Sequence, residues 1–283
     1  VAFRAKNDTQ VDPQKPDRRF SQRQLVRCLE EVAQRFGWSR RNAKPAQVRD
    51  GRWLVGMGMA AAFRNHINRR SGARVTLQPN GHVLVETDMT DIGTGSYTIM
   101  AQIAAEILGL PVEKVTMSLG DTNDPPAAGS GGSWGAASAG SAVYLAAERV
   151  REKLAKAMGV KPENLTLKDG MAIGDNRSVP LAELVGKDGL SAIGEIKPGQ
   201  QEKQFNQASY GAHFAEVGVN VVTGEVRVRR MLGVFAAGRV LNAKTARSQC
   251  LGGMTFGIGT ALTEELIHDS RTGKLVNHDL AEY

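Results

Sequence analysis

The strongest constraint on the fold is a run of small residues from Ala127 to Ala142, in which every residue except Trp134 is Gly, Ala or Ser. A segment with so little side-chain volume brings its backbone close to whatever it contacts. Helical spacing continues from the run, so we expect a helix over Ser133–Met158. The small face then packs against another backbone or a bulky ligand; a flexible linker is the alternative, which the helix disfavours.

The composition supports a globular chain without a membrane span. The 283 residues are 41% hydrophobic, enough to fill a core, while 32 glycines and 5% aromatics favour close backbone contacts over an aromatic surface. No apolar run approaches the ~18–20 residues that a span needs, and the N-terminus lacks a signal-peptide core. We therefore expect a cytoplasmic or periplasmic protein. Because the chain begins at Val1 rather than Met, we interpret it as a fragment or a processed piece.

Hairpins and helices alternate without a regular order, which favours an α+β fold over a doubly wound parallel sheet. Residues 1–20 are interpreted as a linker-like stretch, because Val11–Arg19 is polar and contains two prolines, and 21–283 as a bipartite α+β unit. A helix capped by Ser21 is expected to end at Gly37. The other predicted elements are a buried strand at Trp53–Phe63, a strand at Val115–Leu119, helices at Ser96–Leu108 and Ala243–His268, a loop at Asp121–Gly132, and hairpins at Ala73–Leu77/His82–Glu86, Leu165–Leu167/Met171–Ile173 and Ala212–Val222/Val226–Phe235.

The net charge of +7 is unevenly distributed along the chain. Residues Val1 to Arg74 contain 17 Lys/Arg and 6 Asp/Glu, whereas the rest contains 19 and 23. A basic segment attracts nucleic-acid phosphates, but aromatic residues for base stacking are almost absent between these cations. A surface that contacts an acidic partner subunit, or a solvated helix face, is the preferred interpretation.

The sequence contains no recognisable set of catalytic or metal-binding groups. Cys28 and Cys250 cannot form an iron–sulfur cluster or a Cys-rich zinc site, and they are either a disulfide or, as we favour, two buried thiols. The five histidines show no metal-ligand spacing, and no Ser–His–Asp arrangement is present. We therefore predict no catalytic residue and no metal ligand.

Three Gly/Ser segments lead directly into expected helices, where backbone amides and the helix dipole favour anions. The first is Asp91–Thr98, for which a plain turn with Ser96 as N-cap is the alternative. The second is Ala127–Ser138. The third is Gly238–Gln249, where Asn242 is a good N-cap and the cations Lys244 and Arg247 in the first turn are unfavourable unless an anion binds. A solvated helix start is the alternative for this segment. Together the three predict an extended ligand with several phosphates.

These same segments resemble the molybdenum-cofactor-binding subunit of the xanthine dehydrogenase/aldehyde oxidoreductase family, and most of all the bacterial three-subunit periplasmic-type aldehyde oxidoreductases. Thr94 stands where many relatives have a glutamine. The resemblance rests on Val1–Asn7, Arg19–Ser21 with Arg35–Trp38, Asp91–Gly95, Pro125–Ala142, Tyr210–Val217, Asn242–Gln249 and Gly252–Met254.

The resemblance implies a molybdopterin cytosine dinucleotide with molybdenum, bound for the hydroxylation of aldehydes or N-heterocycles with water as the oxygen source. It also implies the remaining part of the large subunit, an iron–sulfur subunit and an FAD subunit as partners. Carried over residue by residue, the cofactor contacts are Gly93, Thr94, Gly95, Gly131, Gly132, Gly135, Ala136, Ala137, Ala243, Lys244, Thr245, Arg247, Ser248 and Gln249.

The resemblance places the family's catalytic glutamate, in a Gly-Xaa-Gly-Glu motif, beyond Tyr283. We therefore expect this chain to be inactive in isolation, and we interpret Glu264 and Glu265 on the final helix as ordinary surface or interface acids. A non-catalytic remnant or an assembly module of the same fold is the alternative function.

Overall fold

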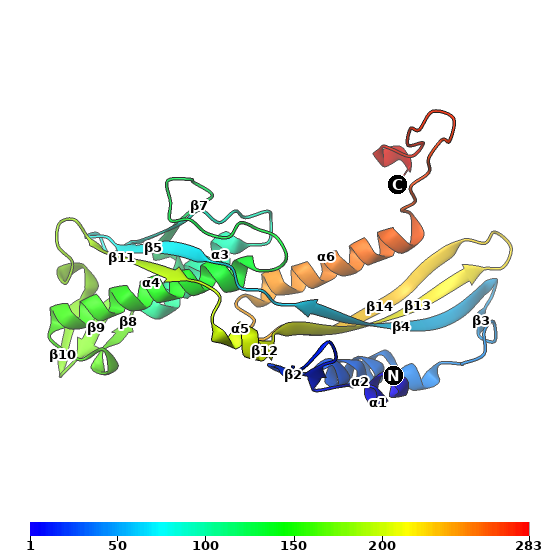
Figure 1. Ribbon diagram of the computed structural model, residues 1–283, viewed down its shortest axis with the longest axis horizontal. Helices are drawn as coiled ribbons and strands as arrows, with labels where there is room; N and C mark the ends of the chain where they lie inside the picture. The colour runs from blue at the N-terminus through cyan, green and yellow to red at the C-terminus, as the bar shows by residue number, and fades with distance from the viewer. Residues whose placement is uncertain (283) are drawn as a thin grey trace. The chain divides into compact units, whose positions relative to one another are not determined.

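The computed structural model describes residues 1–282 and divides the chain into two compact units. Unit 1 consists of Val1–Asn65 and Ala208–Tyr283, and unit 2 is the inserted segment His66–Gln207 (Figure 1). Both units combine helices with β-sheets, antiparallel in unit 1 and mixed in unit 2, so the α+β prediction is confirmed. None of the helices in the described residues is long and apolar enough to cross a membrane.

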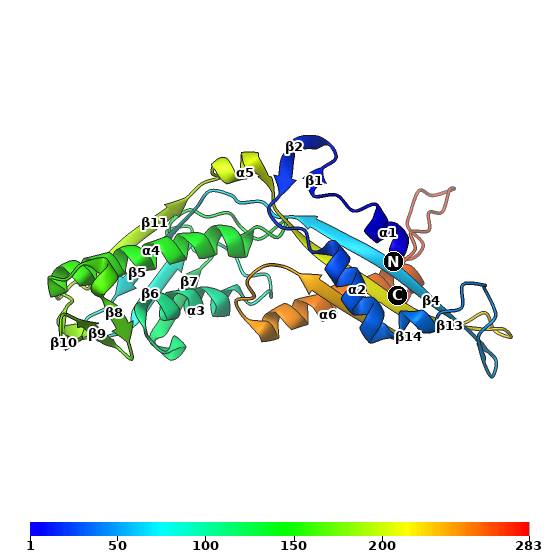
Figure 2. The same cartoon turned by 90° about the horizontal axis from the view of Figure 1, so that it is seen from below.

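Unit 2 is built on a four-stranded sheet with two helices on one face. The strand order is β11-β5-β6-β7, with β6 and β7 parallel and the other pairs antiparallel. α3 and α4 pack against one another and cover the sheet (Figure 2). The elements are β5 (Ser71–Leu77), β6 (Val83–Thr87), α3 (Ser96–Leu108), β7 (Val115–Leu119), α4 (Gly135–Met158) and β11 (Leu190–Ile196).

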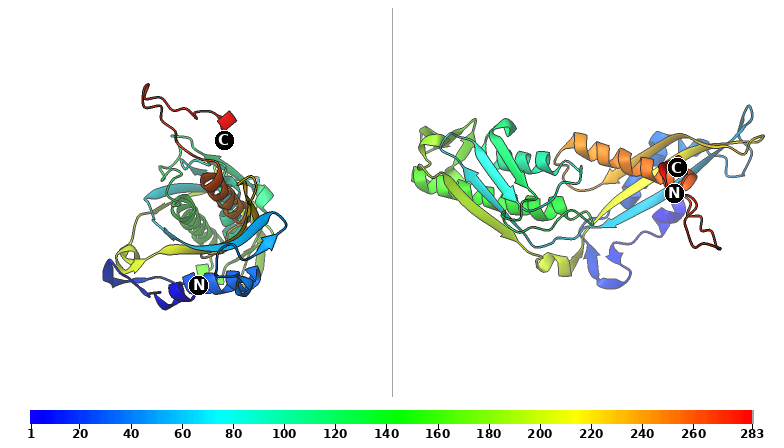
Figure 3. Two further views of the ribbon diagram at one scale, coloured as in Figure 1. Left: turned by 90° about the vertical axis from the view of Figure 1, so that its right-hand side faces the viewer. Right: turned by 90° about the horizontal axis from the view of Figure 1, so that it is seen from above.

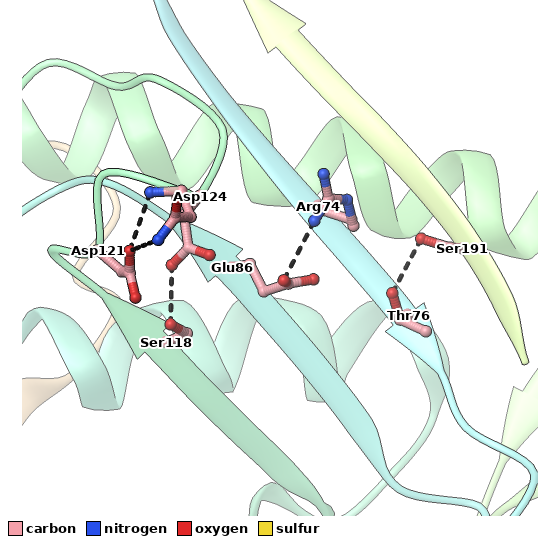
Figure 4. Close-up of polar contacts among 8 residues, drawn as sticks. Arg74, Thr76, Glu86, Ser118, Asp121, Asp124 and Ser191 are labelled. Carbon is pink, nitrogen blue, oxygen red and sulfur yellow. Dashed lines mark hydrogen bonds and ion pairs between the residues drawn. The ribbon is translucent and has the colours of Figure 1, made fainter.

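The core of unit 2 lies between this sheet and its helices, because the strands alternate in side-chain character. Val75, Leu77, Val83 and Val85 are fully buried against the helices. The opposite face is polar: Arg74 forms an ion pair with Glu86 at 3.1 Å, and the Thr76 and Ser191 hydroxyls are 2.9 Å apart (Figure 4). This period-two pattern is the one expected of a sheet buried on one side.

Smaller elements complete unit 2. β8, β9 and β10 form an antiparallel sheet at one end. Their bounds, with those of the remaining helix and strand, are β8 (Thr166–Lys168), β9 (Met171–Gly174), β10 (Arg177–Pro180), α5 (Gln200–Gln204) and β12 (Phe205–Asn206). Short 3₁₀ turns occur at Val112–Lys114, Pro162–Asn164 and Leu181–Glu183.

Unit 1 is built on a long antiparallel sheet, of order β14-β13-β4-β3. α2 packs on one face of this sheet and α6 runs along the other side (Figure 1). The elements are α1 (Ala2–Lys6), β1 (Val11–Asp12), β2 (Lys15–Phe20), α2 (Leu25–Phe36), β3 (Arg49–Asp50), β4 (Trp53–Asn65), β13 (Ala208–Asn220), β14 (Val226–Ala236) and α6 (Ala243–Leu262), with 3₁₀ turns at Trp38–Arg40 and Leu280–Glu282.

Most helices and hairpins form where the sequence predicts them. The three hairpins, the strand at Val115–Leu119 and the helix at Ser96–Leu108 are confirmed, and α2 ends at Gly37 in the left-handed conformation. α4 begins two residues later than predicted, at Gly135. The strand around Met57 is half-buried rather than buried, because its alternate residues are exposed.

The start of the chain differs from the sequence prediction. The expected linker contains the paired strands β1 and β2, because Phe20 packs edge-on against Phe63 and Tyr210 of the long sheet. Ser21 does not cap α2, whose N-cap is Gln24 without a side-chain bond. The intervening residues are held by tertiary contacts instead: the Tyr210 hydroxyl donates to the Gln22 carbonyl at 2.7 Å.

The end of the chain also differs from the prediction. α6 stops at Leu262 rather than His268, so Glu264 and Glu265 lie after the helix and not on it. Both are exposed, beside a hollow of about 550 Å³ that they line with Asn277 and Asp279. The glycines of α6 make no close contact within the described residues, since a Cβ added at Gly252, Gly253 or Gly257 would meet no atom within 4 Å.

Candidate functional site

The best candidate site lies at the carboxyl ends of β6 and β7. Each of these parallel strands is followed by a loop and then by a helix that returns over the same face, so both helices begin at one edge of the sheet. Ligands of α/β sheets bind at this kind of edge, where helix N-termini face outward. The first loop contains residues 88–95 and the second residues 120–134; these are called loop A and loop B below.

Loops A and B are tied to each other by hydrogen bonds. The Asp88 carboxylate accepts the amide of Ala127 at 3.1 Å, and the Thr90 hydroxyl accepts the amide of Ser130 at 3.3 Å. The Ser130 hydroxyl donates in turn to the Thr90 carbonyl. The first two sequence segments are therefore brought together in one place.

A buried carboxylate anchors loop B to its strand. Asp124, 8% exposed, accepts the Ser118 hydroxyl of β7 at 2.8 Å, as Figure 4 shows. Asp121 stabilises the turn before it, accepting the backbone and side-chain amides of Asn123, both at 2.9 Å. These contacts fix the path of the chain toward α4.

The glycines of loop A surround a carboxylate of the chain itself. One Asp91 oxygen accepts the amides of Gly93 and Thr94 at 2.8 and 2.9 Å, and the other accepts the amide of Tyr97 at 3.2 Å. Burial alone would raise the pKa of Asp91, but these bonds lower it. The amides expected to bind a ligand are therefore occupied, and the N-cap of α3 is Gly95 rather than Ser96.

The glycines of loop B leave room for Trp134. Its indole donates to the Gly129 carbonyl at 2.8 Å, and the Arg69 guanidinium lies 5.1 Å from its ring centre. A Cβ on Gly131 would lie 2.9 Å from the ring, and one on Gly132 would overlap it. Packing against Trp134 thus explains why positions 131 and 132 are glycines, and the residue spacing alone does not reveal this contact.

The start of α4 is different, because its first amides have no partner in the described residues. The N-cap residue Trp134 makes no side-chain cap, and the amides of Gly135, Ala136 and Ala137 donate to no protein atom among residues 1–282. Ala136 is exposed and presents only a methyl group. A 24-residue helix with an uncapped N-terminus carries partial positive charge and ready donors there.

The third segment belongs to unit 1, at the start of α6. Asn242 is the N-cap, as predicted, and its side chain accepts the amides of Lys244 and Thr245 at 3.0 Å. Ala243, Lys244, Arg247, Ser248 and Gln249 are exposed, so side chains rather than amides are the available donors.

One side of this helix start forms a groove with α2 and β14. The groove has a volume of about 650 Å³ and contains both cysteines together with Arg27, Glu31 and Arg247. Both thiols are free; Cys28 is buried and Cys250 is half-buried, and burial raises the pKa of each. No cluster of three or more potential metal ligands occurs in the described part of the chain.

Comparisons with known proteins agree with an anion-binding site at these helix starts. Residues 31–283 match the molybdopterin cofactor-binding domain family. The chain belongs to this family. It is 56% identical, over all 283 residues, to the aldehyde oxidoreductase molybdenum-binding subunit PaoC of Escherichia coli K12, of which it spans 39%. It is 32% identical over 280 residues to the putative xanthine dehydrogenase molybdenum-binding subunit XdhA of the same organism, covering 92% of this chain and 37% of that one.

The fold also matches solved molybdenum enzymes. The chain superimposes on CO dehydrogenase from Oligotropha carboxidovorans with a TM-score of 0.81 at 20% identity, covering 97% of this chain and 38% of that one. The family match over residues 31–283 and the identities with PaoC and XdhA confirm the predicted family. This chain spans about two fifths of the curated relatives it matches.

Proposed function

We propose that the chain is the cofactor-binding part of a molybdenum-dependent oxidoreductase large subunit that hydroxylates aldehydes or N-heterocycles. The 56% identity with a molybdenum-binding subunit of an aldehyde oxidoreductase, over the whole chain, is the observation that carries this proposal. Aldehydes are the preferred substrate class for the same reason. When bound, the molybdenum cofactor supplies the two-electron oxidation, and the residues of this chain bind and orient it.

The start of α4 is the proposed contact for the dinucleotide part of the cofactor. A pyrophosphate needs several donors and positive potential, and the amides of Gly135, Ala136 and Ala137 offer both. Loop A contributes differently from the expectation. Because Asp91 occupies its amides, Gly93, beside which no atom lies within 4 Å of an added Cβ, leaves space for the ligand. The Thr94 hydroxyl, 3.2 Å from the Ser96 hydroxyl, can donate to the ligand when Ser96 donates to Thr94, and Gly95 stays a proposed contact.

In unit 1, side chains at the start of α6 are a further proposed contact, considered by itself. Lys244, Thr245, Arg247, Ser248 and Gln249 supply charge and hydroxyl or amide donors, which suit a polyanionic ligand with a polar pterin. The cytosine dinucleotide form of the cofactor belongs to this proposal. So do an iron–sulfur subunit and an FAD subunit that carry electrons away from it.

Molybdenum content is the direct test. We suggest a chimera in which this chain replaces the matched 283 residues of E. coli PaoC, expressed with the other subunits of that enzyme. The purified chimera should contain molybdenum and a cytosine-nucleotide pterin, and it should oxidise aromatic or aliphatic aldehydes. A folded chimera without metal and pterin would leave only a non-catalytic module of the same fold.

A single substitution tests the contact at α4. Ala136→Val adds two methyl groups at an exposed first-turn position, where it should leave the fold intact apart from about 0.5 kcal/mol of helix propensity. The chimera should then lose molybdenum and not merely turn over more slowly. Ala157→Val, at an exposed position of the last turn of the same helix, is the matched control. Full molybdenum content in the Ala136→Val chimera would rule out the contact.

We expect the chain by itself to be inactive, because it matches only 39% of the length of the aldehyde oxidoreductase molybdenum-binding subunits to which it is similar. The purified 283-residue chain should show no turnover of aldehydes or purines with a dye acceptor. Measurable turnover would contradict this part of the proposal.

A further inference from the structure

α6 is unusual among the helices longer than five residues, because none of its residues is buried, whereas α2, α3 and α4 each bury several. From Ser248 to Leu262 it contains no charged residue. Three of its large apolar side chains are exposed: Leu251 by 44%, Phe256 by 73% and Leu262 by 42%. A helical stretch without any charged residue is normally covered by other parts of the protein, and most helices are stabilised chiefly by packing.

The sheet beneath α6 has a matching, nearly bare face. Gly56, Gly58 and Ala60 of β4 point to the side opposite α2 and are exposed. α6 touches this side through Met254, whose sulfur lies 3.3 Å from the Cβ position of Gly233. Ala246, Cys250, Met254 and Ile258 recur at helical spacing and are half-buried, whereas most other residues of α6, drawn as the orange helix in Figure 3, are exposed.

The exposed apolar surface continues beyond the helix. Leu266, Ile267 and Val276 are 74%, 44% and 55% exposed. Together with Leu251, Phe256 and Leu262 they make this part of the chain rich in exposed apolar side chains. Glu264, Glu265, Asp269, Arg271 and Lys274 lie among the residues after the helix, so only Ser248–Leu262 is free of charge. An apolar patch of this kind marks an interface.

We infer that the surface of α6 from Leu251 to Leu262, with the apolar residues that follow it up to Val276, is buried against the part of the large subunit outside these 283 residues. This inference rests on the proposed function, in that it takes the chain to be part of such a subunit. The relatives supply the occupant: more than half of PaoC lies outside the matched region. Gly252, Gly253 and Gly257 allow that part to approach the helix backbone.

Other occupants fit the chemistry less well. The cofactor is an anion, and this part of α6 offers it neither charge nor free backbone donors. A membrane-surface helix needs a cationic polar face beside its apolar one, which is missing after Arg247. The first two turns of α6 thus remain available to the cofactor, while the following turns serve the interface.

Hydrogen–deuterium exchange tests the inference. We expect the α6 amides to exchange about tenfold or more slowly in the PaoC chimera than in the isolated 283-residue chain, because packing closes the helix. Equal rates in the two proteins would overturn the inference. Protection of the isolated chain that increases with its concentration would overturn it too, since a second copy would then be the occupant.

Two substitutions provide a second test of the interface that does not depend on hydrogen–deuterium exchange. Phe256→Asp and Gly253→Val should leave the melting temperature of the isolated chain unchanged, because both positions are open there, but should lower it in the chimera. Val222→Asp, in the turn after β13 and 76% exposed, is the matched control and should be neutral in both. Neutral Phe256 and Gly253 variants in the chimera would contradict the interface.

The same chimera tests the interface and the proposed function separately, through the protection of α6 and the molybdenum content. A chimera with protected α6 but no molybdenum would retain the interface and refute the cofactor role. A chimera that contains molybdenum while its α6 amides exchange freely would support the cofactor role and refute the interface.

Discussion

The carboxylate of Asp91 accepts the backbone amide of Thr94 at 2.9 Å, and it therefore occupies the position that a bound anion would take at the start of α3. The same carboxylate also bonds the amides of Gly93 and Tyr97. Loop A is thus shaped before any ligand arrives. Asp91 acts as an internal substitute for an anion, which is the reason we place the pyrophosphate at α4.

The first prediction concerns this carboxylate. Asp91→Ala should destabilise the chain by about 1 kcal/mol, the typical contribution of a helix cap, as measured by urea unfolding at pH 7. Because the pKa of Asp91 is lowered in the folded protein, its contribution is complete above its unfolded pKa of about 3.9. It is lost as the pH falls through the lower folded pKa. The difference between the two proteins should therefore vanish in strong acid; a difference independent of pH would contradict the cap.

The second prediction separates packing from ligand binding at loop B. Gly131→Ala should destabilise unit 2 by roughly 1–3 kcal/mol, because the new Cβ crowds the ring of Trp134. In a Trp134→Ala background the same substitution should be nearly neutral. A double-mutant cycle of unfolding free energies measures this coupling. Equal effects in both backgrounds would show that Gly131 is needed for another reason.

Local signals in the sequence were enough to predict most of the elements. Gly37 and Gly109 end helices in the left-handed conformation, and Asn80-Gly81 and Thr223-Gly224 join strands, because each needs only its own neighbours. Tertiary contacts decided the rest. β1 and β2 form because Phe20 packs on Tyr210, and the residues of the expected linker contain no pattern that predicts this contact.

The candidate site was predictable in the same uneven way. The three segments and the Asn242 cap were recognisable from residue type and spacing. Asp91, three residues before Thr94, is a cap signal that the glycines obscured, and it could have been found. The position of Trp134 over Gly131 and Gly132 could not, because a side chain returning onto its own loop leaves no periodic pattern.

The third prediction concerns the buried ion pair that holds the N-terminal segment. Arg23 and Asp8 are 2.6 Å apart, with side chains only 11% and 8% exposed, and Arg23 also lies over the ring of Tyr210. Asp8→Ala leaves the guanidinium buried without its partner and should destabilise unit 1 by about 3 kcal/mol. Glu225→Ala breaks the exposed pair with Arg227 and should change stability by about 0.5 kcal/mol or less. Similar losses in both variants would disprove the role of burial.

The fourth prediction concerns His213 of β13. Burial lowers its pKa, and its Nδ1 has no hydrogen-bond partner. Below about pH 6.5 the unfolded chain binds a proton that the folded chain does not, so the unfolding free energy should fall as the pH decreases. His213→Leu should remove this part of the decrease between pH 7 and pH 5.5, whereas His278→Leu, at an exposed position, should not. An unchanged pH profile in the His213 variant would refute the assignment.

The last prediction assigns the basic N-terminal part of the chain to subunit contact. Every residue from Arg41 to Arg52 is exposed, and long cationic side chains, arginine in particular, are favoured at protein interfaces. Replacing Arg41, Lys44 and Arg49 by serine should reduce co-purification of the chimera with its partner subunits. The same change at Lys156, Lys161 and Lys168, three exposed lysines of unit 2, should not.

Duplex DNA binding distinguishes this assignment from a nucleic-acid site. Scattered cations give weak, sequence-independent attraction that falls steeply with salt, because each contact releases counterions. A random duplex in about 150 mM salt should therefore bind poorly, and binding should disappear as the salt rises. Two aromatics lie near this surface, Trp38 and Trp53. Arg41 stacks on Trp38 at 5.0 Å and Arg227 on Trp53 at 5.5 Å, so bases find no open stacking platform there. Tight, salt-resistant duplex binding without subunit association would reverse the assignment.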